Sequence, residues 1–327
     1  MKPADWRPLA TVETLQHGAQ LRTDVRHWMV ERNILEVITP VLSSAAVTDP
    51  QIESFRAESG AVSTNAFLQT SPEFPMKRLL AAYGRDVYQL APVFRAGESG
   101  RYHNPEFTLL EWYRVGIDHR QLMTEIGQLF HSVAVSFDLQ WQADEHAVYW
   151  DVVESFLEIP ASSIDTRSVA RYFADHERSW PQAIDDDLDA ALDLLLDEFW
   201  LPTLPNERLT FLVDYPASQA ALARKRVDAR GRAVADRFEV YVGKVELANG
   251  FFELTDAEEQ LARFEADNRQ RQRNQQHPMP IDRRLLAALE HGLPACAGVA
   301  VGMERLLMVL TGASHINEVL AFDISRG

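Results

Sequence analysis

One stretch of the chain, residues 87–115, constrains the fold more than any other, because two strand-forming runs flank a loop rich in glycine and polar residues. The pattern predicts a β-hairpin whose loop covers residues 96–103. Side chains on a strand alternate between two faces, so Glu111 shares a face with apolar and aromatic neighbours. Burying an unpaired ion is costly. We therefore expect Glu111 to lie at a rim, to pair with Arg95, or to bind a cationic ligand.

Length and composition predict a globular chain with one large core or two modest ones. The chain has 327 residues, of which 46% are hydrophobic and 24% charged. The single cysteine, Cys296, excludes an internal disulfide and a zinc site built from cysteines, and it suits a reducing compartment. No apolar run approaches the roughly 20 residues of a membrane span, and the amino terminus lacks the apolar core of a signal peptide. We therefore expect a cytoplasmic protein without membrane contact.

The charge of the chain argues against nucleic acid as a partner. The formal net charge is −16 at pH 7, so the overall field repels polyanions unless a local basic patch exists. The best candidate is the arginine-rich run 263–273, but a solvated helix face of mixed charge explains this run more simply. Contact with tRNA is therefore not expected.

Periodicity, capping residues and breakers predict the other elements. We expect helices over residues 14–33, 76–84, 256–273 and 281–290, with a further helix after Asp118. We expect strands over residues 34–43, 65–70, 209–216 and 237–255. Residues 140–206 are acidic, contain no glycine and show mainly helical patterns, so they predict a helical insertion.

A second hairpin, after residue 236, carries two glutamates that the sequence places opposite each other. With the turn at residues 242–243, or over residues 241–244, Glu239 lies across from Glu246. Opposed side chains have Cβ atoms about 4.5–5.5 Å apart, and like charges there repel. Magnesium bridging to phosphates would resolve this repulsion, whereas exposed edge carboxylates would need no ion. A bulge at Gly250 would bring Asn249 and Glu246 onto one face.

Near the carboxyl terminus, a strand of small residues leads through Gly302 into a helix that carries Glu304 and Arg305 in its first turn. Amide groups at a helix start favour anions, and a neighbouring arginine strengthens that preference. This corner is therefore a candidate phosphate site. The motifs GxxxxGK[ST] and GxGxxG are both absent, which excludes a P-loop and a dinucleotide-binding Rossmann fold.

Taken together, these segments resemble the catalytic domain of class II aminoacyl-tRNA synthetases, in particular the lysyl branch. The segments ILEVITPVL, VFRAGESGRYHNPEFTLLEWY and GVAVGMERLLM resemble the three class II motifs, while DYPASQAALA and RFEVYVGKVELANGFFEL resemble the lysyl subgroup. The resemblance implies an α+β fold, a mixed and mainly antiparallel sheet flanked by helices, in one catalytic domain over residues 1–327. It also implies a homodimer formed through the first motif, with Trp28 and Met29 exposed on an apolar stripe.

Lysyl-tRNA synthetases also carry an amino-terminal OB-fold that binds the anticodon, and the first helix here begins too early to leave room for one. The chain is thus most similar to free-standing members that use ATP and Mg²⁺ to activate lysine or (R)-β-lysine. Such members transfer it to a lysine side chain of elongation factor P. The alternatives are a truncated enzyme that charges tRNA and a non-catalytic regulatory paralogue.

The resemblance implies roles for individual residues. Arg95 and Arg305 would be the catalytic residues that hold phosphates, and Phe107 would stack on adenine. The other ATP-binding positions would be Glu98, His103, Asn104, Glu246, Leu247 and Gly302, and the magnesium-binding positions Glu239 and Glu246. The positions around the amino acid would be Ser71, Pro72, Glu73, Glu111, Tyr113, Asn249, Phe251, Glu253 and Ala300. Three carboxylates in one pocket suit a substrate with two ammonium groups.

Three positions depart from the lysyl pattern, and one of them is Glu304, where aspartate is usual. Glu98 lies three residues after Arg95, where the lysyl enzymes usually have a glutamate two residues after the arginine. Ala300 occupies a position where those enzymes resemble one another in having glycine. The added methyl group would exclude one position of the substrate amino group, which favours a β-amino acid.

Overall fold

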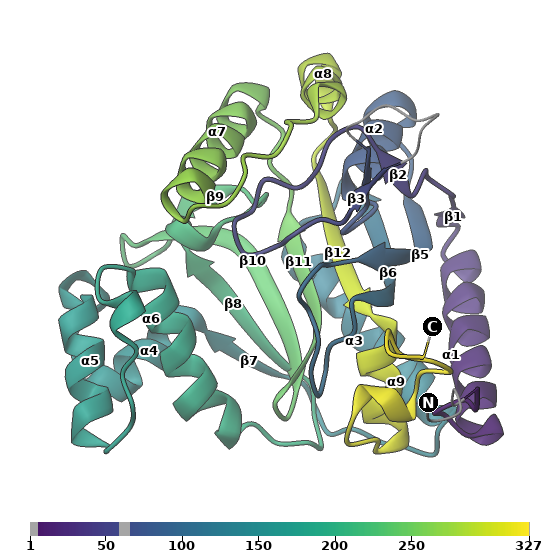
Figure 1. The fold of residues 1–327 in the computed structure, drawn as a ribbon, viewed down its shortest axis with the longest axis horizontal. Helices are drawn as coiled ribbons and strands as arrows, with labels where there is room; N and C mark the ends of the chain where they lie inside the picture. Colours follow the sequence, from purple (N-terminus) through teal and green to yellow (C-terminus); the bar gives the residue numbers. More distant parts are fainter. Residues whose placement is uncertain (1–5, 59–65, 327) are drawn as a thin grey trace, which may run out of the picture. The chain divides into compact units, whose positions relative to one another are not determined.

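The computed structural model describes residues 6–58 and 66–326, which form two compact units (Figure 1). Unit 1 consists of the described parts of residues 1–140 and 252–327, and unit 2 consists of residues 141–251. Helices flank mainly antiparallel strands, as the sequence predicts. The assignment of the whole chain to a single domain stays a prediction.

The predicted hairpin of residues 87–115 forms two of the main strands of unit 1. The strand order is β1 (Leu35–Glu36), β5 (Val87–Phe94), β6 (Glu106–Val115) and β12 (Cys296–Gly302). The pair β1–β5 is parallel, and the pairs β5–β6 and β6–β12 are antiparallel. A smaller sheet has the order β2 (Leu42–Ser43), β4 (Ala66–Leu68) and β3 (Arg56–Ala57). Strand β4 confirms three residues of the strand expected over residues 65–70, and residue 65 lies outside the described residues.

Six helices of unit 1 lie close to the predicted positions. They are α1 (Val12–Glu31), α2 (Glu73–Tyr83), α3 (His119–Val135), α7 (Ala257–Arg273), α8 (Arg283–Gly292) and α9 (Met303–Thr311). Asp118 begins α3 through a capping box with Gln121. Helices α3 and α9 contact β12, α1 contacts both of them, and α8 contacts α2 and α7. The sheet thus gains a helical cover that buries Tyr88 and Trp112 completely.

Helix α1 buries the residues that we expected to be exposed. Trp28 and Met29 are only 5% and 0% exposed, because they continue the inward stripe of Leu21 and Val25 at helical spacing. The predicted exposure of Trp28 and Met29 is therefore wrong. Exposed apolar side chains occur from the end of this helix onward, namely Val30, Leu35, Ile38 and Leu42, and also at its start, namely Val12 and Leu15.

Unit 2 has its own strands and an aromatic core. Strands β11 (Val245–Phe252), β10 (Ala233–Val242), β8 (Thr210–Pro216) and β7 (Glu145–Val148) follow one another, and β9 (Lys225–Val227) pairs with β10. Its helices include α4 (Tyr149–Leu157), α5 (Thr166–Asp175) and α6 (Leu188–Leu195). The predicted insertion 140–206 is mainly helical, but β7 is a strand within it and pairs in parallel with β8. Ring pairs such as Phe173–Trp180 and Trp200–Tyr241 fill the core.

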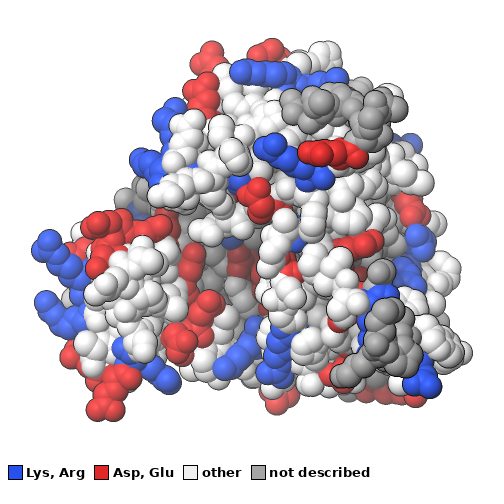
Figure 2. All heavy atoms as spheres, viewed as in Figure 1, with Lys and Arg blue, Asp and Glu red and all other residues white. Residues whose placement is uncertain are grey.

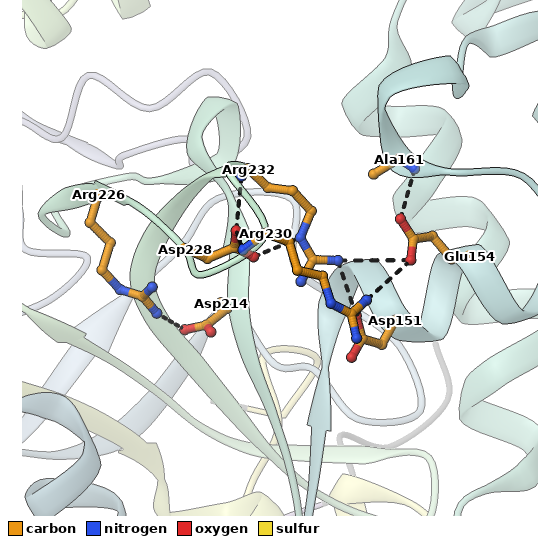
Figure 3. Close-up of polar contacts among 8 residues, drawn as sticks. All are labelled: Asp151, Glu154, Ala161, Asp214, Arg226, Asp228, Arg230 and Arg232. Atoms are coloured by element: carbon orange, nitrogen blue, oxygen red, sulfur yellow. Dashed lines mark hydrogen bonds and ion pairs between the residues drawn. The ribbon is translucent and has the colours of Figure 1, made fainter.

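Arginines of and near the segment that joins β9 to β10 form ion pairs with carboxylates of unit 2. Figure 3 shows Arg230 and Arg232, from the segment that joins β9 to β10, pointing toward α4. Both form ion pairs with Asp151, at 2.8 and 3.0 Å, and Glu154 lies beside them. Arg226 likewise lies between Asp214 and Asp236. The arginines of this segment therefore form ion pairs within unit 2.

The basic run 263–273 lies on α7 and is also largely paired. Arg271 is fully buried, where it contacts Glu53 and three backbone carbonyl groups, and Arg263 pairs with Glu259. The interpretation of this run as a solvated face is thus wrong for Arg271. On the face shown in Figure 2, the coloured basic side chains stand among acidic ones. Among residues 6–58 and 66–326, no helix is long and apolar enough to cross a membrane.

Candidate active site

Glu111 lies at the centre of a buried polar cluster in unit 1. It is 2% exposed, and on the neighbouring strands Gln89 and Ala300 lie directly across from it. Its two carboxylate oxygens accept hydrogen bonds from Ser71 Oγ and Tyr113 Oη, both at 2.7 Å. Burial and, to a smaller extent, the charge of Glu73 raise the pKa of Glu111 to about 7. The two hydrogen bonds hold the carboxyl group in place without neutralising it.

Arg95 does not pair with Glu111, contrary to one of the alternatives drawn from the sequence. Its guanidinium group lies 3.6 Å from Glu98, donates to the backbone oxygen of Thr70, and stands 5.2 Å from the centre of the Phe107 ring. The predicted neighbours Arg95, Glu98 and Phe107 are therefore together. An arginine beside an aromatic ring fits a ligand that has both phosphates and a planar base.

Lys77 is a buried member of this cluster that the sequence reasoning missed. It lies on α2, is 1% exposed, and places its ammonium group 2.6 Å from Glu73 and 2.5 Å from Glu253. Burial alone would lower the pKa of Lys77, but the two carboxylates raise it above its ordinary value. Lys77 is therefore charged in the pocket. The four-residue spacing between Glu73 and Lys77 on a helix was a sequence signal for half of this cluster.

The start of α2 orients this cluster. Pro72 is the residue that precedes the helix, and the backbone amide of Glu73 donates to Ser71 Oγ at 3.0 Å. Ser71 thus links the helix start to Glu111, because the same hydroxyl donates to that carboxylate. A cavity of about 300 Å³ lies beside Ser71 and Glu73, with Asp282 and Arg284 also in its lining.

Gly298 permits the close packing of the cluster. Gly298 is on β12 and lies across from Tyr113 on β6. A Cβ atom at position 298 would come within 2.3 Å of the Tyr113 ring and 2.5 Å of Glu253 Oε1. No side chain can occupy that space unless both neighbours move. Glycine is thus required by the approach of two other residues, and the small-residue pattern of this strand was the only sequence signal for it.

The residues of the predicted phosphate corner lie together at the start of α9, and its binding of phosphate stays a prediction. Gly302 is the residue before the helix, and Arg305 donates to the Tyr102 carbonyl at 3.2 Å and lies 2.5 Å from His103 Nε2. Burial and the charge of Arg305 lower the pKa of His103, so its ring is neutral near pH 7. The Asn104 side chain donates to the Glu106 carbonyl at 2.6 Å and accepts from the Ile324 amide at 3.4 Å.

In unit 2, the predicted opposition of Glu239 and Glu246 is wrong. The turn consists of residues 243–244, one position later than expected, and Glu239 lies across from Asn249. Arg237 at 2.5 Å, Asn249 at 3.2 Å and Tyr241 all donate to the Glu239 carboxylate. Arg237 therefore places a positive charge beside Glu239, where the sequence argument placed a metal ion.

A bulge nevertheless brings Glu246 onto the same face. The register shifts where Tyr241 pairs with Glu246 and Val240 with Ala248, so the extra residue is Leu247 and not Gly250. Because opposed residues share a face, Glu246, Asn249 and Phe251 all face the side of Glu239. Leu247 is buried, which fits a packing role. Within the described residues, no group of three or more histidine, cysteine or acidic side chains has a metal-binding arrangement.

The comparisons with known proteins show the family of the chain. A family described as tRNA synthetases class II (D, K and N) matches residues 4–326, so the chain belongs to this family. A protein named elongation factor P–(R)-β-lysine ligase from Vibrio vulnificus is 44% identical over 326 residues, which cover 98% of each chain. Proteins of the same name from Vibrio cholerae and Proteus mirabilis are 43% and 42% identical, over at least 98% of both chains. The resemblance found in the motifs is confirmed, and it supports a ligase activity.

Proposed function

We propose that the chain activates (R)-β-lysine, or lysine, with ATP and transfers it to a lysine side chain of elongation factor P. The observation that carries this proposal is the cluster of Glu73, Glu111 and Glu253, of which the last two are buried, and which fits an amino acid with more than one ammonium group. The names of the relatives supply the acceptor. The nucleotide-binding residues would be those near Arg95 and Arg305.

The proposed reaction has two steps. A carboxylate oxygen of the amino acid bonds to the α-phosphorus of ATP, the bond from that phosphorus to the bridging oxygen breaks, and pyrophosphate leaves. The acceptor amine then bonds to the activated carbonyl carbon, loses a proton, and AMP leaves. Arg95 and Arg305 would stabilise the phosphate charge, so the rate enhancement would come mainly from positioning and electrostatics.

Magnesium would add positive charge at the phosphates when bound. The oxygen donors on the face of Glu239 and Glu246 have the chemistry that this ion prefers, but Glu239 already accepts three hydrogen bonds. Following the resemblance to the lysyl subgroup, we propose that Glu246 is a magnesium ligand. Glu239 would chiefly hold Arg237 in place.

The proposed function is tested by pyrophosphate exchange with ATP, followed by mass analysis of elongation factor P. Exchange should depend on (R)-β-lysine or lysine, and the mass of elongation factor P should rise by one such residue. Exchange with charging of tRNA instead would favour the truncated synthetase. Absence of exchange and of any mass change would favour a non-catalytic paralogue and overturn the proposal.

Glu246→Gln should raise the magnesium concentration needed for half-maximal exchange, because the variant loses one charge from the proposed metal site. Glu239→Gln should have a smaller effect on that concentration but should lower the melting temperature, since it weakens the contact with Arg237. Both quantities are measured on each variant. Equal magnesium dependence in the two variants would contradict the assignment of Glu246.

The exposed residues Val30, Leu35, Ile38 and Leu42 are proposed to form the homodimer contact, since a solvent-exposed apolar group of this kind marks an interaction surface. Sedimentation should give about twice the chain mass of 37.1 kDa. Ile38→Asp should shift the protein toward the monomer, because Ile38 is 93% exposed. Val227→Asp, at an exposed site in unit 2, is the matched control and should stay dimeric. A wild-type monomer at micromolar concentration would contradict the assignment.

Ala300 is expected to set the preference between lysine isomers. Its position across from Glu111 puts its methyl group beside the amino-acid pocket. One methyl group is worth about 1–3 kcal/mol in a packed pocket, so Ala300→Gly should shift the preference toward α-lysine by about tenfold or more. Exchange rates with both isomers on both proteins give the change in preference. An unchanged ratio would remove Ala300 from the specificity determinants.

A further inference from the structure

The charges around Glu111 do not match a substrate with two ammonium groups unless Lys77 is counted. The carboxylates of Glu73, Glu111 and Glu253 bring three negative charges when ionised, whereas (R)-β-lysine brings two ammonium groups, and its carboxylate belongs with Arg95 in the proposed function. Lys77 supplies one more positive charge inside the same cluster. With Lys77 included, the pocket has two net negative charges.

Burial and two ion pairs hold the positive charge of Lys77 within this cluster. It is 1% exposed and lies between Glu73 and Glu253, at 2.6 and 2.5 Å. Glu253 is equally buried, so its charge would be strongly unfavourable without this partner. Glu111 is different, because its partners Ser71 and Tyr113 are neutral. The negative charge of an ionised Glu111 would therefore be stabilised by a cationic ligand.

We propose that Lys77 is a specificity-determining residue that sets the net charge of the amino-acid pocket to −2 and thereby selects a substrate with two ammonium groups. This inference rests on the proposed function and adds the reason for its substrate class. A dication in the pocket favours the ionised form of every carboxylate, so the count applies to the bound state. Removal of one carboxylate would leave a net charge of −1, which suits a single ammonium group.

A purely structural role for the Lys77–Glu253 pair makes a different prediction. Replacing a buried ion pair by neutral groups of similar volume is often neutral or stabilising. Under that role, removal of either charge or both would change stability and affinity for all amino acids together. The ratio of affinities for substrates with two amines and with one would then stay constant, which separates the two roles.

The test measures binding by calorimetry with two probes. One is (R)-β-lysine, and the other is (R)-3-aminoheptanoic acid, in which a methyl group replaces the terminal amine. Wild type, Glu253→Gln and the double variant Lys77→Met/Glu253→Gln are compared, and melting temperatures establish that each is folded. Glu73→Gln, alone and with Lys77→Met, repeats the same charge arithmetic at a less buried carboxylate.

Wild type should prefer the diamine, Glu253→Gln should reduce that preference by about tenfold or more, and the double variant should restore it to within about threefold of wild type. The Glu73 pair should behave in the same way. If both double variants keep the reduced preference of the single ones, or if the single variants keep the wild-type preference, the role of Lys77 is overturned. Equal binding of both probes by wild type would instead overturn the proposed substrate and this inference with it.

Discussion

Glu111→Gln is expected to weaken binding of the amino acid far more than binding of ATP. The glutamine can keep the hydrogen bonds with Ser71 and Tyr113 but lacks the charge that we propose faces a substrate ammonium group. Loss of one partner from a buried charged pair typically costs about 2–5 kcal/mol, so affinity for (R)-β-lysine should fall well over tenfold. Calorimetry with the amino acid and with ATP, measured separately, checks this selectivity.

The matched control is Glu106→Gln, which removes an exposed carboxylate from the same strand and should leave both affinities unchanged. The wild type should also bind the amino acid less tightly as pH falls below about 7, because the raised pKa of Glu111 makes its carboxyl group take up a proton in that range. Glu111→Gln should lose that part of the pH dependence. Equal loss of affinity for both ligands would instead make Glu111 a structural residue.

Gly298→Ala should disrupt the proposed amino-acid pocket by displacing two of its side chains. The new Cβ atom would lie 2.3 Å from the Tyr113 ring and 2.5 Å from Glu253 Oε1, so both side chains would have to move. Overpacking of this kind typically costs about 1–3 kcal/mol of stability. We expect a lower melting temperature and an affinity for the amino acid at least about tenfold weaker, since Tyr113 also holds Glu111.

Gly100→Ala is the control for this variant. Gly100 is exposed, and a Cβ atom there would meet no other atom within 4 Å. It should therefore keep the stability and the amino-acid affinity of the wild type. A Gly298→Ala protein with unchanged stability and affinity would show that Tyr113 and Glu253 can move without consequence.

Features that depend on local sequence could be predicted well. The hairpin 87–115, the helix after Asp118 and the helix after Gly302 follow from alternation, capping and breakers, which act over a few residues. The neighbours Arg95, Glu98 and Phe107 follow from one hairpin. The proximity of these three residues is therefore predictable from the sequence.

Features that depend on strand register or on packing between distant residues could not be predicted from the sequence. A turn placed one residue too early, together with the unforeseen bulge at Leu247, moved the partner of Glu239 from Glu246 to Asn249. The contact of Lys77 with Glu253 joins residues 176 positions apart in the chain, and no periodic pattern encodes it. Trp28 and Met29 were misjudged because a stripe of apolar residues does not tell which surface covers it.

The aromatic core of unit 2 has a practical consequence for spectroscopy. Four of the seven tryptophans, Trp141, Trp150, Trp180 and Trp200, belong to unit 2, and of the other three Trp6 is largely exposed. Intrinsic fluorescence should therefore follow the loosening of unit 2 more closely than that of unit 1. Far-ultraviolet circular dichroism weights both units by their helices. Denaturation curves from the two signals coincide only if the units lose structure in one cooperative step, so their comparison measures how far damage to the amino-acid pocket spreads through the chain.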